Sequence, residues 1–230
     1  MLDVIAVTLM PGMFEALTGY GVVGDAFQSG KARLRTIDPR AYAADARGTV
    51  DDAPYGGGPG MVLKPEPMAR AIDAAKAELP AARVCLLSPD GRIFAAADAE
   101  RMAARSQHIF VCGRYLGIDQ RIIDSRVDDV ISLGSFVASG GELPAMAVIE
   151  AVVRHVPGVL GCGDSLRAES FAGAARLAPP CYTRPEEFEG QKVPAVLLGG
   201  DHGAIERWRK EEAGRRTAAW RARQDDETPR

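Results

Sequence analysis

Short apolar runs alternate with helical patterns through the first 155 residues. The apolar runs are VIAVTLM, RVCLL ending at Leu87, HIFVC ending at Cys112 and DDVISL ending at Leu133. Between them, apolar residues recur with helical spacing around Ala69 to Ala77, Ala95 to Ala104 and Ile118 to Asp124. Strands that alternate with helices of this length predict an α/β fold with a parallel sheet covered on both faces.

Two further helices border this pattern. PGMFEAL, directly after the first run, has a proline at a first-turn position and predicts a helix start. Leu143 to His155 is strongly apolar and stops before Pro157 and Gly158. We expect this second helix to be buried, in the core or against another subunit.

The chain divides near its last third. From Pro157 to Pro180 periodicity is lost while Gly, Ser, Ala and Pro accumulate, which indicates a linker. A short segment ending in VPAVLL and a helix from about Asp201, a plausible N-cap, follow. We therefore predict a first domain over 1–160, a linker over 161–180 and a small, mainly helical domain over 181–230.

The composition, 47% hydrophobic and 26% charged, is that of a soluble globular protein. No apolar run approaches the roughly 18 residues of a membrane span, and Asp3 stands where a signal peptide would be basic, so we expect a cytoplasmic protein. The cysteines and histidines are too dispersed for a metal site, and buried thiols are the expected state of Cys85, Cys112, Cys162 and Cys181.

Charge limits the possible partners. A net charge of −3 argues against nonspecific coating of duplex phosphates. From Gly203 to Arg223, however, the chain has seven basic and three acidic residues, a local excess of 7 − 3 = +4. This excess is compatible with a solvated helix face or with a local contact to an anionic partner.

Three glycine-rich loops carry the candidate chemistry: Tyr55 to Met61, Cys112 to Asp119 and Ser132 to Met146. Two follow predicted strands directly, and ligands of open parallel sheets sit beyond the carboxyl ends of strands. None matches a dinucleotide or P-loop triphosphate pattern. The loops therefore favour a ligand held largely by backbone groups, such as an adenosine-containing cofactor.

At these loops the chain resembles the TrmD-type tRNA (guanine-N1)-methyltransferases of the SPOUT superfamily. The resemblance covers nearly the whole chain in the expected order. It rests on TVDDAPYGGGPGMVLKP, LLSPDGR, CGRYLGIDQRIID, SGGELPAM, IEAVVRHVPGVLG, YTRPEEFEG, VPAVLLGGDH and IERWR.

The resemblance implies a homodimer with a deep trefoil knot in the first domain and S-adenosylmethionine bound bent within it. The knot would form where the chain near Ser132 to Met146 threads past the loops near Ser88 and Cys112. Carried over by position, the cofactor residues are Leu87, Ser88, Pro89, Gly113, Tyr115, Gly117, Leu133, Gly134, Ala138, Gly140, Gly141 and Pro144.

The same resemblance implies methyl transfer to N1 of the guanosine just 3′ of the tRNA anticodon. Glu169 matches the base that removes the N1 proton, and Arg154 matches the cation that stabilises the developing negative charge. Arg184, Arg207, Arg209 and Lys210 are the expected phosphate contacts to tRNA.

Two departures from the family pattern bear on activity. Glu169 replaces the usual Asp, and its extra methylene moves the carboxylate by about 1 Å, a shift that can cost about 100-fold in rate. Leu116 replaces a family Glu associated with the cofactor pocket and with Mg²⁺, so a Mg²⁺ requirement is open. Two alternatives remain: a catalytically weakened relative that binds cofactor and RNA, and a SPOUT methyltransferase with another RNA target.

Overall fold

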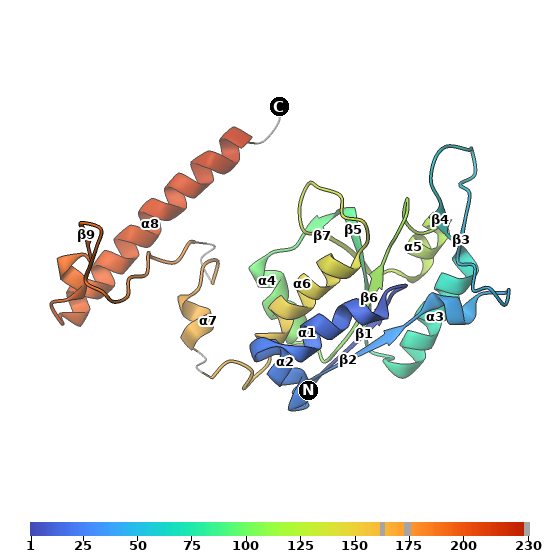
Figure 1. The fold of residues 1–230 in the computed structure, drawn as a ribbon, viewed down its shortest axis with the longest axis horizontal. Coiled ribbons are helices and arrows are strands. Elements are labelled where there is room, and N and C mark those ends of the chain that lie inside the picture. Colours follow the sequence, from blue (N-terminus) through green and yellow to red (C-terminus); the bar gives the residue numbers. More distant parts are fainter. Residues whose placement is uncertain (162–163, 173–175, 228–230) are drawn as a thin grey trace. The chain divides into compact units, whose positions relative to one another are not determined.

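Two compact units make up the chain, Met1–Gly161 and Cys162–Arg230. The computed structural model (Figure 1) describes residues 1–161, 164–172 and 176–227.

The N-terminal unit is built on a five-stranded sheet in which every neighbouring pair is parallel. The strand order is β2-β1-β6-β5-β7. The predicted α/β class with a parallel sheet is confirmed. The strands are β1 (Leu2–Val7), β2 (Ala32–Ile37), β5 (Arg83–Ile93), β6 (Gln107–Cys112) and β7 (Asp129–Ser132).

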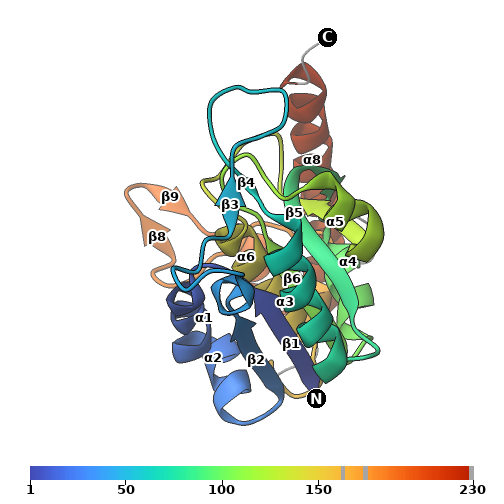
Figure 2. The ribbon, with the colours of Figure 1, turned by 90° about the vertical axis from the view of Figure 1, so that its right-hand side faces the viewer.

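Both faces of this sheet are buried, because side chains of a strand alternate between its two sides. On β1, Leu2, Val4 and Ala6 join one apolar cluster, whereas Ile5 and Val7 join another. The first cluster includes residues of α2 (Gly21–Gln28), α4 (Ala96–Ala103) and α6 (Glu142–Val153). The second includes residues of α3 (Pro65–Glu78) and α5 (Gln120–Arg126), the helices on the other face (Figure 2).

Local sequence explains where several of these helices begin. Proline occupies the first turn of α3, where its missing N–H is not needed. Asp119 caps α5 by accepting a hydrogen bond from the backbone N–H of Arg121 at 3.0 Å. PGMFEAL folds as a 3₁₀ turn, Pro11–Phe14, followed by α1 (Glu15–Gly19).

The hydrophobic pattern did not reveal β2 and the preceding α2. The strand sequence ARLRTI carries two arginines, and β2 is an edge strand that pairs with β1 alone. Edge strands tolerate charged residues because one side of their backbone faces away from the sheet. The short pair β3 (Asp51–Asp52) and β4 (Val62–Leu63) and the 3₁₀ turn Pro39–Tyr42 complete the unit.

In the C-terminal unit, the segment after residue 175 lies along the long helix α8 (His202–Glu227). Thr217 accepts a hydrogen bond from the backbone N–H of Leu177 at 3.0 Å, and Arg216 donates to the carbonyl of Ala178 at 2.7 Å. The unit also contains α7 (Asp164–Ala168), β8 (Glu187–Phe188), β9 (Gln191–Lys192) and the 3₁₀ turn Ala195–Leu197. Helix α7 lies within the segment predicted to be a linker.

Within the described ranges, no helix is both long and apolar enough to cross a bilayer. The expectation of buried thiols is confirmed for Cys85 and Cys112, which are free and buried. It is wrong for Cys181, which is exposed. Cys162 lies outside the described residues.

His108 is a buried polar residue in β6. Its Nε2–H donates to the carbonyl of Met102 at 2.8 Å, whereas Nδ1 has no partner among the described residues. Burial lowers the pKa of His108 below its ordinary value of 6.5, because the charged imidazolium is poorly solvated there. The folded protein therefore holds this ring neutral.

We predict that the free energy of unfolding falls as the pH drops below about 6.5. In that window the unfolded chain protonates His108 to a greater extent than the folded chain, because folding lowers the pKa of this ring, so protons favour unfolding. Urea titrations at pH 7.5 and 5.5 measure the effect. His108→Gln should reduce the pH dependence, whereas His202→Gln, on an exposed residue, should leave it unchanged. An equal pH dependence in wild type and His108→Gln contradicts the assignment.

Candidate functional site

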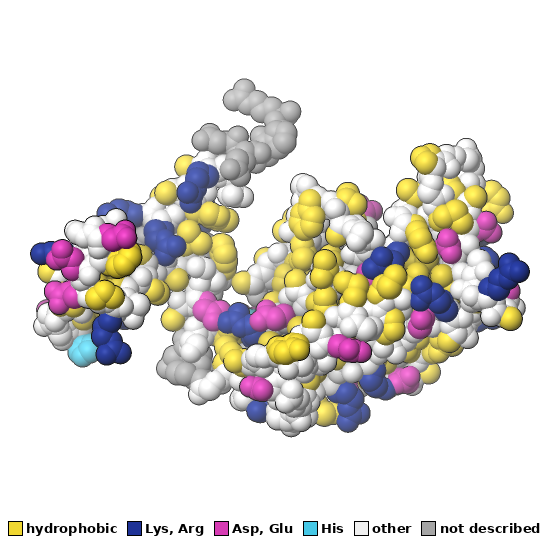
Figure 3. Space-filling view, in the orientation of Figure 1, with side chains coloured by type: hydrophobic (Ala, Val, Ile, Leu, Met, Phe, Trp, Pro, Cys, Tyr) yellow, Lys and Arg dark blue, Asp and Glu magenta, His cyan; other side chains and the backbone are white. Residues whose placement is uncertain are grey.

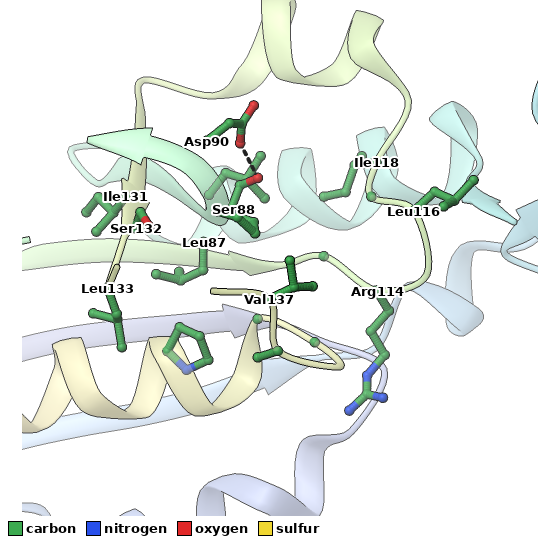
Figure 4. Close-up of a pocket in the computed structure, with 18 of the residues that line it drawn as sticks. Leu87, Ser88, Asp90, Arg114, Leu116, Ile118, Ile131, Ser132, Leu133 and Val137 are labelled. Atoms are coloured by element: carbon green, nitrogen blue, oxygen red, sulfur yellow. Dashed lines mark hydrogen bonds between the residues drawn. The ribbon is translucent and has the colours of Figure 1, made fainter. Parts of the chain in front are cut away.

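A cavity of about 430 Å³ lies in the N-terminal unit, at the ends of β6 and β7 and beside the irregular stretch of β5 between Leu87 and Arg92 (Figure 4). Its walls come from segments 86–90, 113–123 and 131–144. This is the end of an open parallel sheet at which ligands bind. The cavity is therefore the candidate ligand site of this unit.

The structure brings the sequence-predicted cofactor residues together around this cavity. All twelve line it: Leu87, Ser88, Pro89, Gly113, Tyr115, Gly117, Leu133, Gly134, Ala138, Gly140, Gly141 and Pro144. Two of the three glycine-rich loops thus meet at one place. The third, Tyr55 to Met61, supports the wall from behind, since the backbone N–H of Leu116 donates to the carbonyl of Met61 at 2.9 Å.

Close backbone contact between the two lining loops requires glycine at position 141. The backbone N–H of Gly141 donates to the carbonyl of Gly113 at 2.9 Å. A Cβ atom on Gly141 would lie 2.9 Å from Cys112 Cα and 3.1 Å from the Gly113 nitrogen. Because backbone atoms cannot give way as a flexible side chain can, only glycine allows this approach.

A cavity walled in this way suits a ligand recognised by backbone groups. Gly113, Gly140 and Gly141 bring backbone to the lining with no side chain of their own, and Ser88, Ser132 and Ser139 add small polar groups. Leu87, Leu133 and Val137 add apolar surface (Figure 4). Polar backbone beside an apolar slot fits an adenosine-containing cofactor, whose flat base and ribose need both.

Glu142, the first residue of α6, lies fully buried behind the cavity wall. Its Oε1 accepts hydrogen bonds from Thr8 Oγ1 at 2.9 Å and from Arg114 Nε at 3.1 Å. Its Oε2 is buried without a hydrogen-bond partner among the described residues. Burial and the nearby Glu142 charge raise the pKa of the Cys112 thiol well above its usual range, so this thiol stays protonated.

These contacts join three segments that are distant in sequence. Thr8 follows β1, Arg114 follows β6 and Glu142 begins α6. The cluster therefore fixes the loop containing Arg114 against the start of α6. Sequence reasoning did not single out Glu142 or Arg114, although an ionisable residue within each glycine-rich loop was a usable signal.

Two side chains give the cavity its distinctive chemistry. Leu116, 61% exposed, contributes hydrocarbon to the lining. Asp90, which sequence reasoning also missed, contributes a carboxylate and accepts a hydrogen bond from Ser88 (Figure 4). In the described parts of the chain, no group of three His, Cys, Asp or Glu residues is arranged to hold a metal ion.

The remaining predicted residues belong to other parts of the fold. Arg154 caps the C-terminus of α6, with its Nε 3.9 Å from Glu150 Oε1. Glu169 follows α7 in the C-terminal unit. Within that unit, Glu169 lines a hollow of about 790 Å³ together with Arg184, Arg209 and Lys210, and Arg207 lies on the same helix α8 as the last two.

Comparison with known proteins identifies the family. The model of the family described as tRNA (Guanine-1)-methyltransferase TrmD matches residues 2–225. The chain belongs to this family. It is 50% identical over 220 residues to a tRNA (guanine-N(1)-)-methyltransferase of Cupriavidus necator, covering 94% of this chain and 84% of that protein. Proteins of the same name from Burkholderia mallei and Burkholderia pseudomallei are 52% identical over 220 residues, covering 94% of this chain and 83% of theirs.

The family match extends from residue 2 to residue 225 and so includes residues of both compact units of this TrmD family member. The resemblance drawn from the glycine-rich loops is thereby confirmed.

We predict that Glu142→Ala lowers the free energy of unfolding by about 3–5 kcal/mol, because it leaves the Arg114 guanidinium without its buried partner. Urea denaturation measures the change. Glu78→Ala is the matched control, because Glu78 pairs with Arg35 on the surface and such pairs contribute about 0–1 kcal/mol. Equal effects of the two substitutions would contradict a special role for the buried pair.

Proposed function

We propose that this protein moves a methyl group from S-adenosylmethionine to N1 of the guanosine at position 37 of tRNA, immediately 3′ of the anticodon. Membership of the TrmD family makes the chain a tRNA methyltransferase. The observation that carries the specific proposal is the assembly of all twelve expected cofactor residues around one cavity at the carboxyl edge of a parallel sheet.

S-Adenosylmethionine supplies an activated methyl group when bound. Gly113, Gly140 and Gly141 would let its adenosine approach the backbone, because glycine places no side chain of its own in the cavity. Leu87, Leu133 and Pro144 would contact its apolar surfaces. The Glu142–Arg114 pair holds the two loops together: Arg114 lines the cavity, whereas Glu142 lies behind the lining and its contribution is positional.

Two residues would act on the guanine. N1 bears a proton and is a poor nucleophile, so the Glu169 carboxylate would take this proton. The negative charge left on N1 and O6 would be stabilised by the Arg154 guanidinium. The N1 electron pair would then bond to the methyl carbon as the carbon–sulfur bond of the donor breaks, with a neutral thioether as the leaving group. Arg184, Arg207, Arg209 and Lys210 would bind tRNA phosphates, since guanidinium groups form paired hydrogen bonds to phosphate oxygens.

The proposed assembly is a cytoplasmic homodimer, with a domain over 1–160, a linker over 161–180 and a tRNA-binding domain over 181–230. Large apolar side chains on the surface of the N-terminal unit support dimerisation, as on the face with α1 and α6 (Figure 3). Leu143, at the start of α6, is 59% exposed although it is apolar. In such a dimer, Glu169 of one subunit could serve the cofactor of the other.

We further propose that the N-terminal unit contains a deep trefoil knot. Close passage of segments supports it. A Cβ on Gly91 would lie 2.6 Å from the backbone nitrogen of Ile131, and Arg114 forms an isolated bridge with Gly140. Strand β5 thus passes β7 at backbone distance, and the loop after β6 does the same with the loop after β7.

The proposal predicts N1-methylguanosine in a tRNA whose position 37 and preceding nucleotide are both guanosine. Nucleoside mass spectrometry after incubation with S-adenosylmethionine measures the product. Arg154→Ala should lose about 100- to 1,000-fold in kcat, the scale for removing one transition-state donor. Arg154→Lys keeps the positive charge but not the planar guanidinium, so its kcat should lie between those of wild type and Arg154→Ala.

The outcomes separate the alternatives. Full activity of Arg154→Ala contradicts the role of Arg154. Cofactor binding without any methylated product favours a relative that binds but does not turn over. A methylated product in another RNA, but none in this tRNA, indicates a different target.

Leu116 and Glu169 are the residues that favour weakened catalysis. Leu116 lines the cavity with hydrocarbon and offers no oxygen to a cation. We predict that the double variant Leu116→Glu with Glu169→Asp raises kcat, because misplacement of a reacting group by about 1 Å can cost about 100-fold. Single-turnover methylation measures the change, and each single variant apportions it. An unchanged or lower rate in all three variants contradicts the view that these residues limit turnover.

A further inference from the structure

The charged groups at the cavity differ in how well they are neutralised. Among the described lining residues, Arg114 carries the one positive charge and Asp90 the one carboxylate. Arg114 directs its guanidinium away from the other labelled lining side chains (Figure 4), and its Nε donates to the fully buried Glu142 at 3.1 Å. The charge of Arg114 is therefore matched by Glu142 behind the wall.

Asp90 has no comparable partner. It accepts a hydrogen bond from Ser88 and forms no salt bridge within the described parts of the chain. The arginine two residues later, Arg92, is paired elsewhere: Nη1 lies 2.8 Å from Asp98 and Nη2 lies 2.7 Å from Asp129. Asp90 thus presents an uncompensated negative charge at the rim of a cavity whose other lining residues are neutral or neutralised.

We propose that Asp90 binds the positive charge of the cofactor, which makes it a cofactor-binding residue beyond the twelve already named. This inference rests on the proposed function. S-Adenosylmethionine carries a sulfonium, an ammonium and a carboxylate, and hence a net charge of +1 at neutral pH. One free carboxylate in the cavity matches that net charge. The same carboxylate favours the cation-bearing donor over uncharged adenosine compounds.

Three ligands that differ in their positive charges distinguish which cation Asp90 contacts. S-Adenosylmethionine has both cations, S-adenosylhomocysteine keeps the ammonium but has a neutral thioether, and 5′-methylthioadenosine has neither cation. Asp90→Asn removes the charge while its amide oxygen can still accept from Ser88. Asp90→Glu keeps the charge. Glu100→Gln, an exposed acid on α4 outside the cavity lining, is the control for the overall field of the protein.

Isothermal titration calorimetry on the full-length chain gives the dissociation constants. We expect Asp90→Asn to weaken the binding of S-adenosylmethionine about tenfold, the effect expected from loss of a hydrogen bond to a charged group. Binding of 5′-methylthioadenosine should not change. Asp90→Glu should recover part of the loss, and Glu100→Gln should behave as wild type. Raising the salt concentration should weaken S-adenosylmethionine binding to wild type more than to Asp90→Asn.

The result with S-adenosylhomocysteine shows which cation of S-adenosylmethionine Asp90 contacts. If Asp90→Asn weakens the binding of S-adenosylmethionine and of S-adenosylhomocysteine equally, Asp90 binds the ammonium. If it weakens the binding of S-adenosylmethionine alone, Asp90 binds the sulfonium. Either result supports the proposal. Unchanged binding of all three ligands, or an equal loss for all three, overturns it. Failure of wild type to bind any of the three instead overturns the proposed function, and the inference with it.

Discussion

The architecture of the cavity depends on the contacts of the buried Glu142 carboxylate with Thr8 and Arg114. A fully buried charge is unfavourable unless nearby groups neutralise and hydrogen-bond it. Thr8 and Arg114 meet this requirement from two other segments, and in doing so they hold the loop after β6 against the first turn of α6. The 2.9 Å hydrogen bond from Gly141 to Gly113 then joins the same two segments through their backbones. The cavity wall is thus a consequence of one desolvated ion pair and one close backbone contact.

Most described residues of the cavity lining are small or apolar, so the few charged side chains among them have a large effect on which ligand binds. Leu116 makes one part of the lining apolar, whereas Asp90 supplies a negative charge at another. Arg114 is compensated by Glu142 and adds no net charge. The adenosine of a cofactor is recognised by shape and backbone groups in such a site, and its charged tail by the few ionic groups at the rim.

The groups proposed to act on the tRNA base belong to different compact units. Arg154 ends a helix of the N-terminal unit whose first turn contributes Pro144 to the cavity, so its position is coupled to the lining through a rigid element. Glu169 and the basic residues Arg184, Arg209 and Lys210 belong to the C-terminal unit, where they line one hollow. The proposed cofactor site and the proposed RNA-binding residues thus belong to separate compact units.

The sequence by itself determined the parallel sheet, most of its helices, the glycine-rich loops and the family. Strands buried on both faces appear as continuous apolar runs, and RVCLL and HIFVC show this pattern directly. Tertiary structure decided what local pattern does not encode. The edge strand β2 is stabilised by pairing with β1, so its polar sequence gave no signal. Glu142 and Arg114 are 28 residues apart, and only the fold places them 3.1 Å from each other. The free charge of Asp90 likewise became visible only once the partners of Arg92 and Arg114 were known, because neutralisation depends on distances in space rather than on order along the chain.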